Sequence, residues 1–400
     1  MRAQLTQAVE LADQGNVDAS LAALSSILTH DAQLDEQLHA EALELQGRCQ
    51  LGALANIQSM ISFEEAAERY ANCGRPAEAA YCRLLGVRKL LDDRLLREAR
   101  NQLTPTLREA IAKGWGDVLS LGLEFLGLLC FHTKELRKAS GLLEEALMRG
   151  DTRKLSWERM LVKLSLANCC SALGDNAAAA RLMAEITGDP RHKRIPRVAA
   201  YVLMNQGYDA YLAGDTRLAR ELFEKVVQIS SAGLRSPNGL GWLSRMANYN
   251  LGLIAIEDGD YDHARRMLLD VVQVTSEHGY YQLLCGSLTS LCIVELLLDD
   301  LDSAKRHAAL CQSYVNQFGD IETRLADYFL ALVYLALGQL DYAQLLWLYK
   351  PVLEDNSETQ LHYSWMRRVL AHLLERGAQP PYCLSSEAQA LARRWQAELQ

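Results

Sequence analysis

The chain contains few residue patterns that could carry out catalysis. It lacks the phosphate-binding pattern G-x-x-x-x-G-K-[ST], the nucleophile pattern G-x-S-x-G and the zinc-protease pattern H-E-x-x-H. His307 and Cys311 are four residues apart, a spacing that lets two helical side chains share a metal ion, but no second pair accompanies them. We therefore expect no enzyme activity, no cofactor and no metal site.

Two segments of the chain are strongly charged, and the basic one is a candidate contact site. The segment GDPRHKRIPR carries Arg191, Lys193, Arg194 and Arg197, which could meet an acidic partner, a phosphate group or a nucleic acid. A solvated loop between helices is the alternative interpretation. Asp299, Asp300 and Asp302 form an acidic turn, which helix capping explains better than calcium binding because the ligand spacing of a calcium loop is missing.

The composition favours helices that would position such residues. Half of the 400 residues are apolar and only 8 are proline. Leu and Ala dominate, which favours helix over strand. A chain of this length exceeds a single compact core, so it forms either several domains or a repeat array. The net charge of −9 argues against a large nucleic-acid surface, which needs a basic face.

The sequence also predicts a compartment. The N-terminal residues lack the apolar core of a secretion signal, and the longest apolar run, Val118 to Phe131, is interrupted by Glu124 and is too short to span a bilayer. The ten cysteines are scattered, and most lie in apolar runs, which is typical of reduced, buried thiols. We expect a cytoplasmic protein without membrane contact.

An internal repeat organises the chain. Residues 205–227 and 250–272 share Asn, Gly, Gly-Asp and Ala-Arg at equal positions with an offset of 45. Each segment predicts two helices joined by a short turn. The Gly-Asp dipeptide ends the first helix and caps the second. Gly207 and Gly252 would allow close approach of the paired helix, and Ala219 and Ala264 would lie where the two helices cross.

The same turn-then-small-residue signal recurs through the chain. Turn positions fall at 15, 94, 134, 174, 214, 259, 299 and 338, and one more is expected near Asn56 to Met60. The long 230–241 segment accounts for the single 45-residue step, and Thr104-Pro105 predicts a kink or a restart within a helix. About eight to nine helical hairpins would thus fill the chain.

These residues resemble the tetratricopeptide repeat. The resemblance rests on Tyr249-Asn250-Leu251-Gly252, Gly259-Asp260-Tyr261-Asp262 and Ala264. It implies an all-α fold, an α-solenoid that forms a right-handed superhelix with a C-terminal capping helix. We expect one superhelix over residues 1–400, with degenerate repeats in 1–115, clearer repeats in 116–376 and a capping segment in 377–400. The longer period, about 40 residues, resembles that of the maltose-regulator and peptide-sensing bacterial regulators, although the chain has no recognisable ATPase module or helix-turn-helix.

The resemblance also implies a concave groove lined by the first helix of each repeat. The residues that it places in this partner-binding groove are Tyr201, Met204, Tyr208, Tyr211, Met246, Tyr249, Leu253, Asn168 and Tyr328. Tyr and Met suit partner binding, but they also pack well between helices. Asn205 and Asn250 share one repeat position, where they form either a clamp for a peptide backbone or hydrogen bonds between helices.

The sequence is compatible with three functions. The first is a non-enzymatic scaffold or adaptor that binds a protein or peptide in the groove. The second is a ligand- or peptide-responsive regulator of a transcription or secretion partner. The third is a nucleic-acid-associated helical repeat protein that uses the 191–197 loop, and the net negative charge of the chain argues against it. Self-association is compatible with all three.

Overall fold

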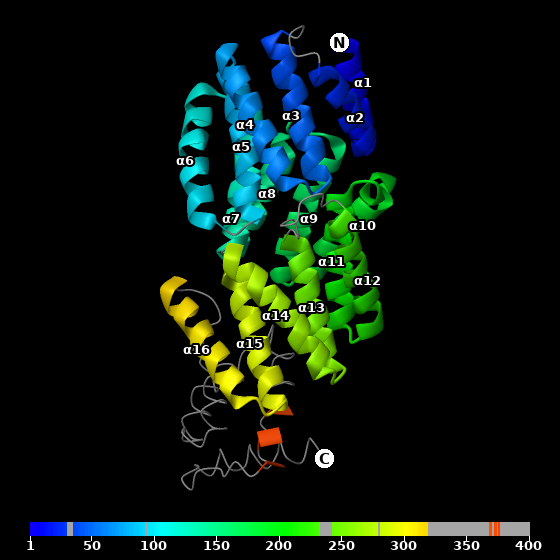
Figure 1. Ribbon diagram of the computed structural model, residues 1–400. Coiled ribbons are helices and arrows are strands. Elements are labelled where there is room, and N and C mark those ends of the chain that lie inside the picture. The colour runs from blue at the N-terminus through cyan, green and yellow to red at the C-terminus, as the bar shows by residue number, and fades with distance from the viewer. Residues whose placement is uncertain are drawn as a thin grey trace. The chain divides into compact units, whose positions relative to one another are not determined.

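A computed structural model describes residues 1–29, 35–92, 95–232, 242–278 and 281–318, and six residues of the segment 368–376. Every secondary-structure element in these described ranges is a helix (Figure 1). The chain divides into two compact units, Met1–Ala247 (unit 1) and Asn248–Gln400 (unit 2), and each is described by itself below.

The helices follow one another as antiparallel pairs. The first helices of the pairs are α1 (Arg2–Asp13), α3 (Glu36–Gly52), α5 (Pro76–Asp92), α7 (Gly116–His132), α9 (Ser156–Ala172), α11 (Pro196–Leu212), α13 (Trp242–Glu257) and α15 (Tyr281–Leu297). The second helices are α2 (Val17–Leu28), α4 (Asn56–Asn72), α6 (Leu96–Lys113), α8 (Leu136–Arg149), α10 (Asn176–Gly188), α12 (Thr216–Ala232), α14 (Tyr261–His278) and α16 (Leu301–Phe318). A short 3₁₀ helix, η2 (Pro190–Lys193), precedes α11.

Each described turn within a pair contains a residue in the left-handed conformation, and residues 93 and 94 of the α5–α6 turn lie outside the described residues. The φ angle is positive at Gly15, Leu54, Lys134, Gly174, Gly214, Gly259 and Asp299. The Asp after the glycine caps the second helix as predicted, because Asp215 Oδ1 accepts from the Leu218 N–H at 3.0 Å and Asp260 Oδ1 from the His263 N–H at 3.2 Å. The turn expected near Asn56 to Met60 lies earlier, at Leu54, and α4 already begins at Asn56. The predicted turn residues Arg94 and Gly338 lie outside the described residues.

Glycines in the first helices allow the paired helices to approach closely. A Cβ atom at Gly207 would come within 2.7 Å of the Phe223 ring, and one at Gly252 within 3.1 Å of Leu268. The crossing residues Ala219 and Ala264 are fully buried. Both findings confirm the predicted packing role of these small residues.

Helix α6 runs through the Thr104-Pro105 step without a break. Thr104 therefore does not act as the cap of a new helix, and its hydroxyl instead donates to the Arg100 carbonyl at 2.8 Å. The restart that the sequence suggested at this point is wrong.

In unit 1 the first two helical pairs pack against the fifth and sixth pairs. One apolar cluster joins Leu24 of α2 and Leu38 of α3 to Trp157 of α9 and Val198 of α11. Asp13, at the end of α1, accepts from the Ser156 N–H at 2.6 Å, a contact that spans 143 residues of sequence. Ion pairs join the inner faces of α3 and α9, of α5 and α7, and of α5 and α11 in the interior of unit 1.

Unit 2 is built around α15. Its residues Leu288, Cys292 and Glu295 are fully buried, and a Cβ atom at Gly286 would lie 3.3 Å from the Tyr249 hydroxyl. Arg368 donates to the Glu257 carboxylate at 2.9 Å, next to the end of α13. The expected capping segment 377–400 lies outside the described residues, and the expectation of one continuous superhelix stays a prediction. In the described part of the chain, no helix has the length and apolar character needed to cross a bilayer.

Candidate functional site

One face of α11 passes from the interior of unit 1 to its surface. The residues Arg197, Tyr201, Asn205, Tyr208 and Leu212 recur at spacings of three or four, so they share one side of the helix. Arg197 is 1% exposed, Tyr201 and Asn205 are half-buried, Tyr208 is 48% exposed and Leu212 is 57% exposed. The C-terminal half of this face is therefore open to a partner.

Helix α9 presents the equivalent face beside it. Ser165, Asn168 and Ala172 precede the α11 residues Asn205, Tyr208 and Leu212 by one 40-residue repeat. The Asn205 side-chain amide donates to Asn168 Oδ1 at 2.7 Å, which shows that the two faces adjoin. These six residues are called the α9–α11 surface below.

The α9–α11 surface is neutral and has unused hydrogen-bonding capacity. Among the described residues, Asn168 Nδ2 finds no acceptor and Asn205 Oδ1 finds no donor, whereas the Ser165 hydroxyl is occupied by the Leu161 carbonyl at 3.0 Å. Its amides, one exposed Tyr and one exposed Leu can recognise a neutral backbone and apolar side chains. Next to Tyr208, burial raises the pKa of the Asp209 carboxyl.

Three of the predicted groove residues on α11 are buried or half-buried and do not belong to the α9–α11 surface. Tyr211 is buried because it stands one turn after Gly207 and so faces α12, and Met204 is buried as well. Tyr201 is half-buried next to Arg88. The expectation that Tyr201, Tyr208 and Tyr211 all line an accessible groove is thus corrected, since only Tyr208 is exposed.

The remaining predicted groove residues do not extend this surface. Met246, in unit 1, is half-buried. In unit 2, Asn250 and Leu253 are buried and Tyr249 packs on Gly286. Tyr328 lies outside the described residues. Of the two asparagines proposed as a clamp, Asn205 is therefore accessible and Asn250 is not.

The interior of unit 1 contains many charged side chains, and the sequence patterns predict few of them there. Arg48 of α3 donates to the Glu44 carboxylate at 2.8 Å and to the Glu158 carboxylate of α9 at 2.6 Å. In the loop 150–155, Asp151 accepts from the Tyr81 hydroxyl at 2.6 Å, and the Lys154 ammonium lies 2.6 Å from the Glu124 carboxylate. Buried charged side chains destabilise a fold unless each one is paired with an opposite charge or a hydrogen-bonding group.

Arg197 belongs to this interior and not to a contact loop. Its Nη1 and Nη2 donate to the same oxygen of Asp92 at 2.9 and 2.8 Å, and its Nε donates to the Leu51 carbonyl at 2.9 Å. Asp92 also accepts from Arg88 Nε at 3.2 Å. The sequence-based expectation that Arg197 contacts a partner is corrected by this buried position.

Burial and pairing move the pKa values of the interior carboxyls in different directions. For Glu44, burial raises the pKa, but Arg48 and Arg153 together outweigh burial, and the net pKa is lowered. For Glu158 and Asp151, burial dominates and the pKa is raised despite their cationic and hydrogen-bonding neighbours. Protonation of Glu44 is therefore less favourable in the folded chain than in the unfolded chain. Protonation of Glu158 and of Asp151 is more favourable in the folded chain.

The interior charges balance. Five basic residues, Arg48, Arg88, Arg153, Lys154 and Arg197, face five acidic residues, Glu44, Asp92, Glu124, Asp151 and Glu158. This part of unit 1 is already occupied by its own side chains. An open groove along α3, α5 and α7, as expected from the resemblance, is not what the structure shows there. A cavity of about 20 Å³ beside Arg197 and Tyr201 has room for roughly one water molecule.

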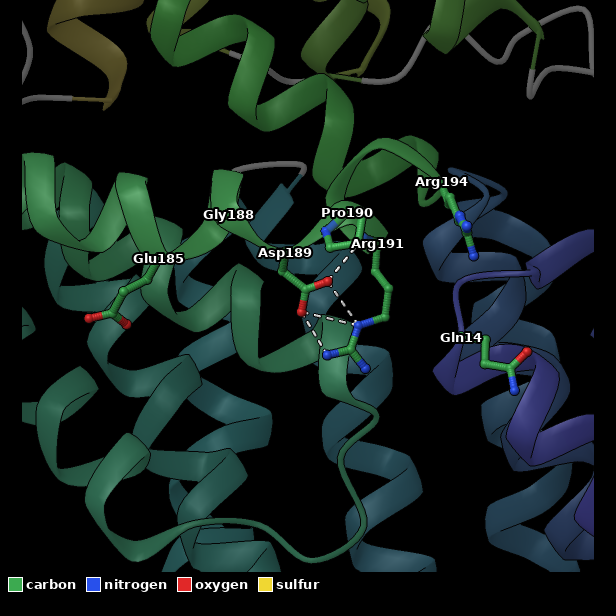
Figure 2. Close-up of a pocket in the computed structure, with 7 residues that line it drawn as sticks. All are labelled: Gln14, Glu185, Gly188, Asp189, Pro190, Arg191 and Arg194. Atoms are coloured by element: carbon green, nitrogen blue, oxygen red, sulfur yellow. Dashed lines mark hydrogen bonds and ion pairs between the residues drawn. The ribbon is translucent and has the colours of Figure 1, made fainter.

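The predicted basic loop borders a wide hollow of about 620 Å³ (Figure 2). Figure 2 shows Asp189 and Arg191 turned toward each other, and Arg191 Nη2 lies 2.6 Å from Asp189 Oδ2. This pairing lowers the pKa of Asp189 and raises that of Arg191. Lys193 and Arg194 are exposed. The hollow is lined by two acidic and two basic side chains, Glu185, Asp189, Arg191 and Arg194, so it offers no net charge to a phosphate or nucleic acid.

The residues with metal-ligand spacing are engaged in other contacts. His307 Nδ1 lies 2.9 Å from both oxygens of the buried Glu295 carboxylate, and Cys311 lies 3.7 Å from the Thr289 hydroxyl. Within the described ranges, no cluster of three or more His, Cys, Asp and Glu side chains is arranged to hold a metal ion. In the acidic turn, Asp300 caps α16 by accepting from the Ser303 N–H at 3.1 Å, as predicted. Cys130, Cys285, Cys292 and Cys311 are buried, also as predicted.

Comparisons with known proteins identify the fold. No family model matches the chain, and no curated protein matches it. Among solved structures, a signal-transduction ATPase with a tetratricopeptide repeat sensor from Pyrococcus horikoshii matches with a TM-score of 0.51 and 14% identity over 87% of this chain. The APC/C hetero-tetramer Cut9–Hcn1 matches with a TM-score of 0.53 and 12% identity over 88% of this chain. The chain spans only 51% and 59% of the lengths of these two structures.

A third structure is matched along nearly its whole length. It is a Rap protein complexed with Competence and Sporulation Factor, with a TM-score of 0.50 and 13% identity over 99% of this chain and 96% of that one. The chain therefore has the all-α, solenoid-type fold of tetratricopeptide repeat proteins. At these identities the likeness concerns the fold alone.

Proposed function

We propose that the chain is a non-enzymatic scaffold that binds an extended peptide segment of a partner protein on the α9–α11 surface. The observation that carries the proposal is the Asn168–Asn205 amide pair. The two amides meet at 2.7 Å and retain one unused donor group and one unused acceptor on a half-exposed face. An extended peptide presents both a C=O and an N–H at each residue, so one peptide unit matches this pair.

The neighbouring side chains would supply affinity. Tyr208 and Leu212 are among the most exposed large apolar residues of the described chain, at 48% and 57%, and they continue the same face of α11. Aromatic anchors that become buried carry much of the energy of a typical interface. The ligand would accordingly pair its backbone with the amides and place an apolar side chain against Tyr208.

The similarity to the Rap structure supports ligand binding by this type of fold, since that protein is complexed with Competence and Sporulation Factor. It also favours a second candidate, a regulator whose conformation responds to its ligand. The two candidates share the α9–α11 surface. They differ in outcome, because a regulator changes its amide hydrogen exchange far from the bound ligand, whereas a scaffold changes it only at the surface.

A displayed peptide library selected on the wild-type chain provides the ligand for the test. The affinity of the best peptide is then measured on Asn205→Ala and on Tyr208→Ala. We expect a loss of roughly fivefold or more for Asn205→Ala, and of roughly thirtyfold for Tyr208→Ala, from typical hydrogen-bond and aromatic-anchor energies.

Leu218→Ala is the matched control, because Leu218 is an exposed apolar residue, 40% accessible, on α12. Melting temperatures of all three variants should stay near that of the wild type. If selected peptides bind the Asn205 and Tyr208 variants as tightly as the wild type, the α9–α11 surface is not the binding site.

A further inference from the structure

We propose that unit 1 contains a recognition site for an arginine side chain, and that the chain's own Arg153 fills it in this structure. An arginine-bearing segment of a partner protein would compete with Arg153 for the site. The site consists of Glu44 of α3, Tyr70 of α4, and Glu78 and Tyr81 of α5. It is separate from the α9–α11 surface, so it stands or falls independently of the proposed function.

The contacts around Arg153 are those that select a guanidinium group. Its Cζ lies 5.9 Å from the ring centroid of Tyr70 and 4.9 Å from that of Tyr81. Its Nη2 pairs with the Glu44 carboxylate, and its Nη1 lies 3.9 Å from the Glu78 carboxylate. A planar cation that spreads its charge fits aromatic faces and carboxylates together better than the compact, strongly hydrated ammonium of lysine does.

The site lies at the rim of the interior, where an outside group can reach it. The Arg153 side chain is 23% exposed and that of Glu78 is 17% exposed, whereas the side chains of Arg48 and Arg197 are only 3% and 1% exposed. Three-quarters of the Arg153 side chain is nevertheless buried, so an arginine in its place would be largely desolvated. Arg153 is thus the interior cation that solvent reaches most easily.

The loop that carries Arg153 is anchored by other residues. Asp151 Oδ1 accepts from the Arg153 N–H at 2.9 Å, and Asp151 Oδ2 accepts from the Tyr81 hydroxyl at 2.6 Å. Lys154 is held by Glu124 at 2.6 Å. The Arg153 side chain can therefore leave without unfolding the loop. Its Nε is buried with no hydrogen-bond partner among the described residues, which lowers the cost of leaving because water satisfies that donor.

The pocket keeps its shape when Arg153 leaves. Glu44 still accepts from Arg48 at 2.8 Å and from the Tyr70 hydroxyl at 2.9 Å. The balanced interior of five basic and five acidic residues would then hold four basic against five acidic ones. Removing Arg153 thus takes one positive charge away from beside Glu44 and Glu78, which favours a cation there and disfavours a neutral or acidic side chain.

The proposal is tested by removing the Arg153 side chain and measuring the binding of two small probe molecules. The full chain with Arg153→Ala is titrated calorimetrically with Nα-acetyl-arginine methylamide and, separately, with Nα-acetyl-lysine methylamide. We expect the arginine probe to bind about tenfold more tightly than the lysine probe. The wild type should bind the arginine probe at least about tenfold more weakly than the variant, because Arg153 competes.

Arg159→Ala is the matched control. Arg159 lies on α9, and its Nη2 donates to the main-chain carbonyl of Asp151 at 3.3 Å, so this variant removes a guanidinium that contacts the same loop without emptying the pocket. It should behave as the wild type does. The proposal is overturned if Arg153→Ala binds neither probe, if it binds both equally, or if Arg159→Ala gains the same binding.

A second variant keeps the test decisive if Arg153→Ala fails to fold. Arg153→Lys retains the positive charge beside Glu44 but stacks less well on the two rings. The arginine probe should bind Arg153→Lys more tightly than it binds the wild type, and adding Glu78→Gln should weaken that binding. Equal affinity for Arg153→Lys and the wild type would overturn the proposal.

Discussion

Arg197 and Asp92 form a two-pronged ion pair across 105 residues of sequence, with distances of 2.9 and 2.8 Å from one carboxylate oxygen to the two terminal nitrogens. The pair joins the first helix of the sixth pair to the first helix of the third. It is one of the contacts by which the inner faces of unit 1 close on one another.

The first prediction concerns this pair. Asp92→Ala should lower the free energy of unfolding by about 3–5 kcal/mol, because it leaves the Arg197 guanidinium buried without its carboxylate. Urea denaturation measures the change. Glu221→Ala, which breaks the exposed pair of Glu221 with Arg217 at 3.0 Å, is the control and should cost less than about 1 kcal/mol. Equal effects of the two substitutions would mean that the interior pair is not closed in solution.

The second prediction concerns helix approach. Gly207→Ala should destabilise the chain by about 1–3 kcal/mol, because the new Cβ atom would lie 2.7 Å from the Phe223 ring. Gly141→Ala in α8 is the matched control, since a Cβ atom there meets nothing within 4 Å, and it should stabilise the helix by up to about 1 kcal/mol. Thermal melts of both variants should shift in opposite directions. A stabilising Gly207→Ala would contradict the described packing of α11 on α12.

These two cases show which contacts the sequence could predict and which it could not. The roles of Gly207 and of the turn at Gly214 follow from local rules, since a close helix approach and a left-handed turn both require specific residue types. The pairing of Arg197 with Asp92 does not, because the repeat pattern says nothing about which distant helices meet. The signal that was available was the presence of charged residues such as Glu124 inside otherwise apolar helices.

The sequence predicted some residues of the α9–α11 surface and misplaced others. Asn168, Asn205 and Tyr208 were assigned to the first helices of their repeats, and the structure brings the two amides together. Tyr211 was misassigned because it follows Gly207 by four residues, about one helical turn, and so lies above Gly207, against α12. The exposure of the α9–α11 surface depends on how far the interior closes, which is a tertiary property.

The third prediction concerns pH. The lowered pKa of Glu44 means that its ionised form stabilises the folded chain above its ordinary pKa of 4.5, and that this contribution is lost as the pH falls through its lower folded pKa. The difference in unfolding free energy between the wild type and Glu44→Gln should therefore be largest near neutral pH and shrink below pH 4.5.

Denaturation curves at several pH values measure this difference. Comparing wild type with variant isolates Glu44 from Asp151 and Glu158, whose raised pKa values act in the opposite direction. Glu221→Gln, on the surface of α12, should give a small difference at every pH. A Glu44→Gln difference that does not change between neutral pH and pH 3 would show that Glu44 is not paired in solution.

The fourth prediction concerns the amide pair itself. Asn168→Ala should cost at most about 0.5–1.5 kcal/mol of stability, because the hydrogen bond to Asn205 is half-exposed and water can replace it. The same substitution should weaken peptide binding severalfold, since it removes the free amide donors. Parallel melting and binding measurements separate the two effects. A variant that unfolds would place Asn168 in the core rather than on a binding surface.

Site-specific cross-linking tests the central claim most directly. The photoreactive residue p-benzoyl-phenylalanine is placed at Tyr208 in one chain and at Leu218 in another, and each is irradiated with the peptide selected on the wild type. Both positions are exposed, but only Tyr208 lies on the α9–α11 surface. We predict a covalent peptide adduct at position 208 and none at position 218. An adduct at 218 alone, or none at 208 while the peptide still binds, would contradict the account.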